Sequence, residues 1–134
     1  MKRMTLITLL SLFSALLLAP VSRTGVIFAS EGVNRYEPLI RAVVMVESTN
    51  GKYLYNPDEG AVGYFQIRQI RVDHYNQLTG NNYQLEDFYD YELSRKMFLY
   101  YCKGRSYEIV AKSWNGSGEM TKEYWKKIIK HLNQ

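Results

Sequence analysis

Apolar residues recur at helical spacing in five separate stretches of this 134-residue chain. Side chains three and four positions apart share one face of an α-helix, so this spacing predicts amphipathic helices. The predicted helices cover about 36–47, 68–78, 86–102, 106–115 and 121–132. Because strand-like alternation is otherwise absent, the fold class is expected to be mainly α.

Details of the later helices follow from the same pattern. In the second, Ile70, His74, Tyr75 and Leu78 lie in phase and predict its buried face. Ser106 and Thr121 precede the apolar residues of the last two, and hydroxyl residues favour the N-cap position. We therefore expect each of these two residues to cap the helix that follows it.

The first stretch ends on a charged residue. Tyr36, Ile40, Val43 and Glu47 follow one another at steps of four, three and four, so they share a stripe. Asn50-Gly51 then provides a helix stop. The pattern places a carboxylate on the core-facing side of the last turn.

The segment between the first two helices, KYLYNPDEGAVGYFQI (52–67), is rich in turn residues. Its Asn-Pro pair and its glycines mark turns. We expect an irregular loop or a short hairpin here.

Residues 1–29 have the pattern of a secretory signal peptide. Lys2 and Arg3 precede an apolar run from 4 to 21, and small residues lead to an expected cut after Ala29. A retained membrane anchor is the alternative, since about 18 apolar residues is the lower limit for a bilayer span. Export to the periplasm or cell envelope is expected.

Loss of the leader changes the charge of the chain. Lys2, Arg3 and Arg23 leave with it, so 17 basic residues become 14 against 13 acidic ones. A nucleic-acid partner is not expected, because such binders carry a clustered basic face. Lysines 122, 126, 127 and 130 are interpreted as the solvated face of a helix.

The remaining residues, 30–134, form one small domain of ordinary size. Cys102 is the single cysteine, so no intrachain disulfide forms, and disulfide-free secretion suits a bacterial envelope protein. No His or Cys pair has metal-ligand spacing, so neither a metal nor another cofactor is expected.

Glu47 is the candidate catalytic residue. A carboxylate beside apolar groups loses hydration, which raises its pKa, and the negative end of a helix acts in the same direction. A carboxyl group that stays protonated near neutral pH can donate a proton to a leaving oxygen, which glycosidic cleavage requires. Lysozyme is the known example of this logic.

Further motifs follow in a fixed order. Glu47-Ser48 is followed by Asn56-Pro57, by Gly63-Tyr64-Phe65-Gln66-Ile67, by Ser113-Trp114-Asn115-Gly116 and by Tyr124. In order and spacing the chain resembles the catalytic domain of soluble lytic transglycosylases, in the goose-type lysozyme superfamily. The resemblance covers about residues 36–130 and implies a lysozyme-like fold. Ser113 and Ser117 stand where the family usually has Ala and a second Gly, so the resemblance does not define the detailed shape of the Asn115 loop.

The resemblance implies roles for seven residues. Glu47 is the acid and later the base, and Tyr124 orients it. Ser48 lies near the cleavage site, and Asn115 lines the groove. Gln66 and the turn of Gly63 and Tyr64 contact the sugar chain.

The implied substrate is the glycan of peptidoglycan, cut between N-acetylmuramic acid and N-acetylglucosamine. The muramic 6-hydroxyl then closes a 1,6-anhydro end, so one carboxylate suffices, as in other substrate-assisted enzymes. The expected state is a monomer that binds glycan strands, with envelope-spanning machinery as a further candidate partner.

Three alternatives stay open. Asp58 or Glu59 would favour hydrolysis if either were a second carboxylate in the site, although acids in a turn are usually solvated. The altered Asn115 loop is also compatible with a non-catalytic module that binds the wall or assists assembly. The third is a helical interaction protein held by an uncleaved anchor.

Overall fold

A computed structural model describes residues 34–132 of the chain. The predicted signal peptide and its cleavage site lie outside the described residues. Within residues 34–132, no helix has the length and hydropathy that crossing a bilayer requires.

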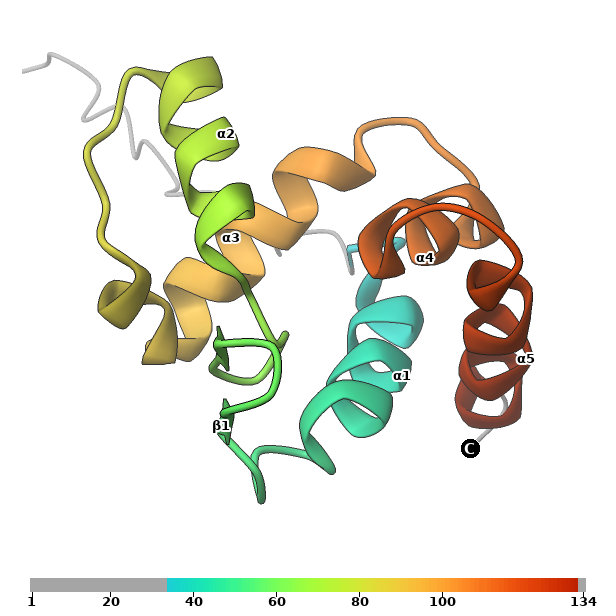
Figure 1. Ribbon diagram of the computed structural model, residues 1–134. Coiled ribbons are helices and arrows are strands. Elements are labelled where there is room, and N and C mark those ends of the chain that lie inside the picture. The colour runs from blue at the N-terminus through green and yellow to red at the C-terminus, as the bar shows by residue number, and fades with distance from the viewer. Residues whose placement is uncertain (1–33, 133–134) are drawn as a thin grey trace, which may run out of the picture. The chain divides into compact units, whose positions relative to one another are not determined.

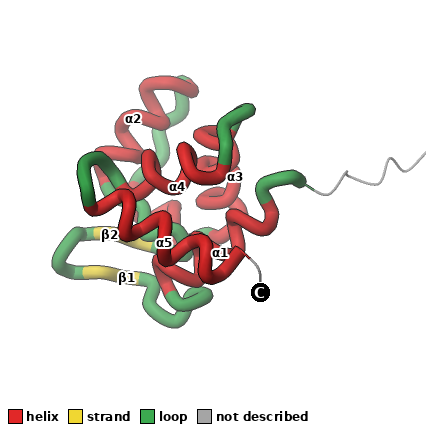
Figure 2. The backbone as a smooth tube through the Cα atoms, turned by 90° about the vertical axis from the view of Figure 1, so that its right-hand side faces the viewer, coloured by secondary structure: helices red, strands yellow, loops and turns green. Residues whose placement is uncertain are grey.

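The described part is mainly helical, as predicted, with five α-helices and one small hairpin (Figures 1 and 2). In chain order the elements are α1 (Glu37–Ser48), β1 (Tyr55–Asn56), β2 (Ala61–Val62), α2 (Gln69–Thr79), the 3-10 helix η1 (Leu85–Tyr89), α3 (Tyr91–Cys102), α4 (Tyr107–Asn115) and α5 (Met120–Leu132).

Helix α1 packs against α5, and α5 also packs against α4, although α1 and α5 lie at opposite ends of the described sequence (Figure 1). The predicted stripe of α1 is buried at Tyr36, Ile40 and Val43, where no side chain is more than 7% exposed. Pro38 lies in the first turn, where proline costs no hydrogen bond. Thr49 and Asn50 then take left-handed conformations, which end the helix directly after Ser48.

The predicted hairpin is present between α1 and α2. Strands β1 and β2 pair antiparallel, with Tyr55 opposite Val62 and Asn56 opposite Ala61. The Asn56 side chain accepts a hydrogen bond of 3.1 Å from the Asp58 N–H, which fixes the turn after β1. In both Figure 1 and Figure 2 the hairpin lies below α2.

A second, tighter turn joins β2 to α2. Val62 and Ile67 exchange backbone hydrogen bonds of 2.8 and 2.9 Å, so residues 63–66 form its loop. Gly63 is buried with φ +75°, and a Cβ there would lie 2.1 Å from the Phe88 carbonyl oxygen. Only glycine fits, because the turn lies directly against the backbone of η1.

Of three predicted helix boundaries, two differ from the sequence predictions and one is confirmed. The predicted helix 86–102 is two elements, because Asp90 accepts a hydrogen bond of 2.7 Å from the Leu93 N–H and starts α3 afresh. Thr121 is not a cap: it lies inside α5, and its hydroxyl donates to the Gly118 carbonyl at 2.7 Å. The predicted Ser106 cap is confirmed by a hydrogen bond from the Ile109 N–H.

The predicted buried face of α2 is confirmed at Tyr75 and wrong at its other positions. Ile70 and Leu78 are 75% and 50% exposed, and Val72, outside the predicted face, is buried beside Tyr75. His74 is exposed, with Nδ1 2.9 Å from the Tyr101 hydroxyl. Because α2 buries only two positions, the spacing of its few apolar residues fits more than one helical phase.

We predict that Gly63→Ala destabilises the protein more than Gly60→Ala does. Both glycines have positive φ, but a Cβ at Gly60 meets nothing within 4 Å. The left-handed conformation costs about 1–2 kcal/mol in each variant, and displacing the Phe88 carbonyl costs Gly63→Ala about 1–3 kcal/mol more. Urea unfolding followed by circular dichroism measures the difference. Equal losses would show that the Phe88 contact does not constrain the turn.

Candidate active site

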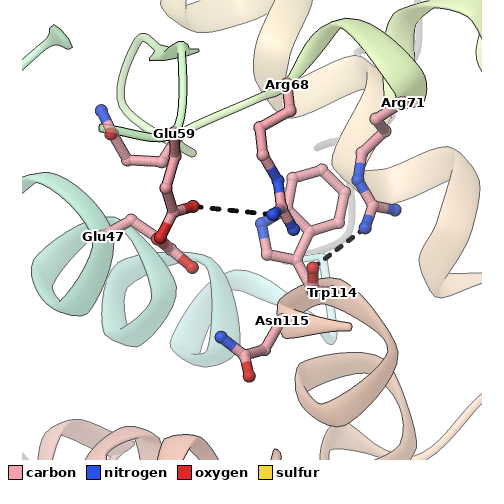
Figure 3. A pocket seen from close by; sticks show the side chains of 7 residues that line it. Glu47, Glu59, Arg68, Arg71, Trp114 and Asn115 are labelled. Atoms are coloured by element: carbon pink, nitrogen blue, oxygen red, sulfur yellow. Dashed lines mark hydrogen bonds and ion pairs between the residues drawn. The ribbon is translucent and has the colours of Figure 1, made fainter. Parts of the chain in front are cut away.

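A polar pocket of about 120 Å³ lies where α1 ends, α2 begins and α4 ends. The pocket is lined by Glu47, Glu59, Gln66, Arg68, Arg71, Trp114 and Asn115 (Figure 3). The lining therefore combines two carboxyl groups, two guanidinium groups and two amides. The chain segments that contribute them are separate in sequence and meet only in the folded protein.

Glu47 lies in the last turn of α1, on the predicted stripe, and opens into this pocket. Burial raises the pKa of its carboxyl group from 4.5 to about 7, and the nearby charge of Glu59 acts in the same direction. A hydrogen bond from Tyr124 and the charges of Arg68 and Arg71 lower the pKa by less. Loss of hydration is thus the dominant effect, and a large fraction of Glu47 carries a proton at neutral pH.

Tyr124 of α5 holds this carboxyl group. Its hydroxyl donates a hydrogen bond of 2.6 Å to Oε1 of Glu47. Burial and the neighbouring carboxyl group raise the pKa of Tyr124 well above 10, so the hydroxyl remains a donor. With Oε1 occupied, Oε2 is the oxygen left to exchange a proton with a ligand.

Gln66 reaches the pocket from the tight turn before α2. Its backbone is left-handed, with φ +49°, which is uncommon for a residue other than glycine. The side-chain Nε2 donates to the carbonyl oxygens of Gly63 at 2.9 Å and Tyr53 at 3.3 Å. These bonds hold the amide in place and leave its Oε1 unbonded among residues 34–132.

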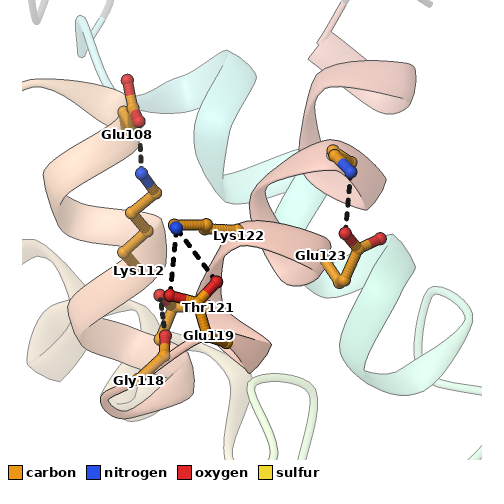
Figure 4. Close-up of polar contacts among 8 residues, drawn as sticks. Glu108, Lys112, Gly118, Glu119, Thr121, Lys122 and Glu123 are labelled. Carbon is orange, nitrogen blue, oxygen red and sulfur yellow. Dashed lines mark hydrogen bonds and ion pairs between the residues drawn. The ribbon is translucent and has the colours of Figure 1, made fainter.

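Asn115 reaches the pocket from the last turn of α4. Its side-chain amide makes no hydrogen bond to any described residue, so all its donors and acceptors are open to a ligand. The loop that follows is fixed by the Thr121–Gly118 hydrogen bond and by an ion pair of 2.9 Å between Lys122 and Glu119 (Figure 4). The loop after Asn115 is therefore internally bonded.

Of the two acids in the hairpin turn, one reaches the site. Glu59 lines the pocket, and Figure 3 shows its carboxyl group facing that of Glu47. It forms an ion pair with Arg68 at 3.7 Å, and both side chains are about half exposed. Asp58 is exposed and is not part of the lining. Glu59, and not Asp58, is therefore the candidate for a second carboxylate beside Glu47.

Arg71 and Trp114 form the opposite wall. The guanidinium carbon lies 4.1 Å from the centre of the Trp114 ring, and Nη2 donates to the Trp114 carbonyl at 2.9 Å. The indole N–H donates to the Phe65 carbonyl at 3.2 Å, so Trp114 is a largely buried packing residue. Stacking of a sugar on this face of the ring would require Arg71 to move.

The structure brings together four of the seven predicted site residues, namely Glu47, Gln66, Asn115 and Tyr124. The other three, Ser48, Gly63 and Tyr64, do not line the pocket.

Ser48 and Tyr64 instead connect α1 to the turn before α2. The Ser48 hydroxyl is buried, lies 2.9 Å from the Tyr64 carbonyl and 3.0 Å from that of Val44, and accepts from the Gly51 N–H at 2.9 Å. The Tyr64 ring packs edge-on against Tyr91, with centroids 5.1 Å apart. In this arrangement both residues position Glu47 and Gln66 relative to each other.

Sequence reasoning missed Arg68 and Arg71. A signal was present, because both lie at the start of a predicted helix that has no acidic residue in its first turn. Cations are disfavoured at this positive end of the helix dipole, and such placement indicates a function other than helix stability. Among the described residues, no three His, Cys, Asp or Glu side chains are grouped closely enough to hold a metal ion.

No family model, curated protein or solved structure matches this chain.

We predict that Glu47→Gln stabilises the protein at pH 8 and has little such effect at pH 4. The unfolded chain releases this proton near pH 4.5 and the folded chain near pH 7, so the free energy of unfolding falls as pH rises between these values. Glutamine removes the cost of burying the charge, a gain of roughly 2–3 kcal/mol at pH 8.

Urea unfolding at both pH values measures this difference. Glu92→Gln, at an exposed position outside the pocket, controls for the loss of one carboxylate. A Glu47→Gln effect that is the same at both pH values would mean that the carboxyl group is not desolvated in the folded state.

Proposed function

We propose that this chain is a peptidoglycan lytic transglycosylase, in which Glu47 acts first as acid and then as base. The observation that carries the proposal is a carboxyl group with pKa near 7 that opens into a polar pocket and is held by Tyr124. A general acid is most effective when its pKa lies near the working pH. The motif order described above supplies the substrate class.

In the proposed reaction, protonated Glu47 gives its proton to the glycosidic oxygen as the bond from that oxygen to C1 of the muramic residue breaks. The N-acetyl group of the same sugar stabilises the positive charge that develops at C1. The muramic 6-hydroxyl then attacks C1, and its proton passes to the Glu47 carboxylate. The acid is regenerated, so one glutamate serves both steps.

The neighbours of Glu47 suit these steps. Tyr124 fixes one carboxyl oxygen, so proton transfer is confined to the other. The free amide of Asn115 and the unbonded Oε1 of Gln66 are available to sugar hydroxyl and N-acetyl groups in the same pocket. Positioning by such groups supplies much of the rate gain in reactions of this type.

Hydrolysis is the second candidate, and the position of Glu59 favours it. Its carboxylate faces Glu47 across the pocket, where a general base for water would lie in a two-carboxylate mechanism (Figure 3). The ion pair with Arg68 competes with this role, because it already engages the Glu59 carboxylate. We therefore place the transglycosylase first.

The place of action proposed is the periplasm or cell envelope, where glycan strands are accessible. The protein is proposed to work there as a monomer, with envelope-spanning machinery as a candidate partner.

We predict that the purified protein releases muropeptides from peptidoglycan and that Glu47→Gln lowers the rate at least 10³-fold while the fold is kept, because the acid is lost. Release is measured by chromatography and mass spectrometry. The rate should fall as pH rises above about 7, where Glu47 loses its proton. Full activity of Glu47→Gln would refute the site, and no release by the unsubstituted protein would refute enzymatic function.

The mass of the products and a Glu59→Gln variant separate the two candidates. A transglycosylase yields muramic ends lighter by one water, and Glu59→Gln should keep at least a tenth of the rate, because no base for water is needed. Asp58→Asn, at the adjacent residue outside the pocket, is the matched control. Hydrated ends, together with a loss of 10² or more in Glu59→Gln alone, would establish hydrolysis instead.

A further inference from the structure

The charges of the pocket do not balance when Glu47 is protonated. Glu59 and Arg68 form an ion pair, so together they contribute no net charge. Arg71 has no carboxylate within ion-pair distance among residues 34–132. When Glu47 is protonated, as the proposed reaction requires, the pocket therefore holds one positive charge in excess.

Arg71 is held rigidly by contacts that leave part of it open. Its guanidinium lies over the rings of Trp114 and Tyr101, at 4.1 and 5.3 Å from their centroids. Nη2 donates to the carbonyl oxygens of Trp114 and Ser113, at 2.9 and 3.4 Å. Because these contacts come from backbone carbonyls and rings of α3 and α4, the guanidinium group is oriented before any ligand arrives.

The other nitrogens of Arg71, Nη1 and Nε, have no partner in the described part of the chain. No buried side-chain nitrogen or oxygen there lacks a hydrogen bond, so these two donors must be accessible to solvent. Burial lowers the pKa of Arg71, but an arginine side chain is effectively always protonated in proteins, so the group stays charged at neutral pH. The result is a preoriented cation with free donors in the wall of the pocket.

The start of α2 adds to the positive potential. Arg68 is the N-cap residue and Arg71 follows within the first turn, where the helix dipole is also positive. An anion in the pocket would be attracted by both.

We propose that Arg71, supported by Arg68, binds a carboxylate of the substrate beside the bond that Glu47 protonates. The inference rests on the proposed function and narrows its substrate to glycan units that carry an acid group. Peptidoglycan offers two such groups, the lactyl carboxylate of a muramic residue without a peptide and the carboxylates of the stem peptide.

The test uses Glu47→Gln, which binds without cleaving and keeps the charge of the protonated acid. Calorimetry compares three tetrasaccharides of alternating N-acetylglucosamine and N-acetylmuramic acid. One carries free lactyl groups, one carries lactyl groups linked to Ala-Glu dipeptides, and one carries neutral lactyl methylamides. We expect one of the two acidic ligands to bind about tenfold or more tighter than the neutral one, and which one it is identifies the carboxylate.

Second substitutions in the Glu47→Gln protein locate the contact. Arg71→Gln should abolish the preference for the acidic ligand. Arg68→Gln should weaken it severalfold by leaving Glu59 unpaired, and Glu59→Gln should strengthen it by freeing Arg68. Arg41→Gln, on the exposed side of α1, is the control and should change nothing.

Circular dichroism checks that each variant folds. If Arg71→Gln does not fold, the opposite effects expected of Glu59→Gln and Arg68→Gln test the inference instead. The inference would be overturned if all three ligands bound equally. It would also be overturned if Glu59→Gln and Arg68→Gln showed the same preference for the acidic ligand. The two proposals fail separately. Cleavage of peptidoglycan with no ligand preference refutes only the carboxylate contact, and a preference without cleavage refutes only the enzyme.

Discussion

The contact between the first and last helices, α1 and α5, fixes the chemistry of the pocket. It buries the stripe of α1, so Glu47 is carried by helical phase to the edge of the core. It also brings Tyr124 within 2.6 Å of the carboxyl group across 77 positions of sequence. Burial removes water from Glu47 and the tyrosine fixes its orientation, so one packing interface supplies both the raised pKa and the geometry. The other pocket residues are arranged around this acid.

The turn between the hairpin and α2 is the second constraint. Gly63 allows the chain to pass against the carbonyl of Phe88, and the left-handed Gln66 then directs its amide into the pocket. Ser48 links this turn to the end of α1 through the Tyr64 carbonyl. The resemblance placed Ser48, Gly63 and Tyr64 at the ligand. In the structure they instead support Glu47 and Gln66, which line the pocket. A motif therefore constrains backbone geometry as well as ligand binding.

The sequence predicted the parts of the fold that depend on strong local signals. The phase of α1 was readable because its buried positions are many, and the hairpin was readable from its Asn-Pro pair and glycines. The phase of α2 was not, since only Val72 and Tyr75 anchor it. Asp90 was a missed cap inside a long apolar pattern. The two arginines at the start of α2 carried a sequence signal, but it does not point to a pocket until tertiary structure brings Trp114 and Glu59 near.

Burial and the neighbouring charges together set the pKa of Glu47. Arg68 and Arg71 favour the ionised form, and burial and Glu59 favour the neutral form. A carboxylate bound at Arg71 would offset one of the two cations that oppose protonation of Glu47. By linkage, a ligand that raises the proton affinity of Glu47 binds more tightly when the proton is present. In the proposed reaction, binding of an acidic substrate would therefore favour the protonated form of Glu47, which cleavage requires. With a neutral glycan bound, Glu47 would more often be ionised.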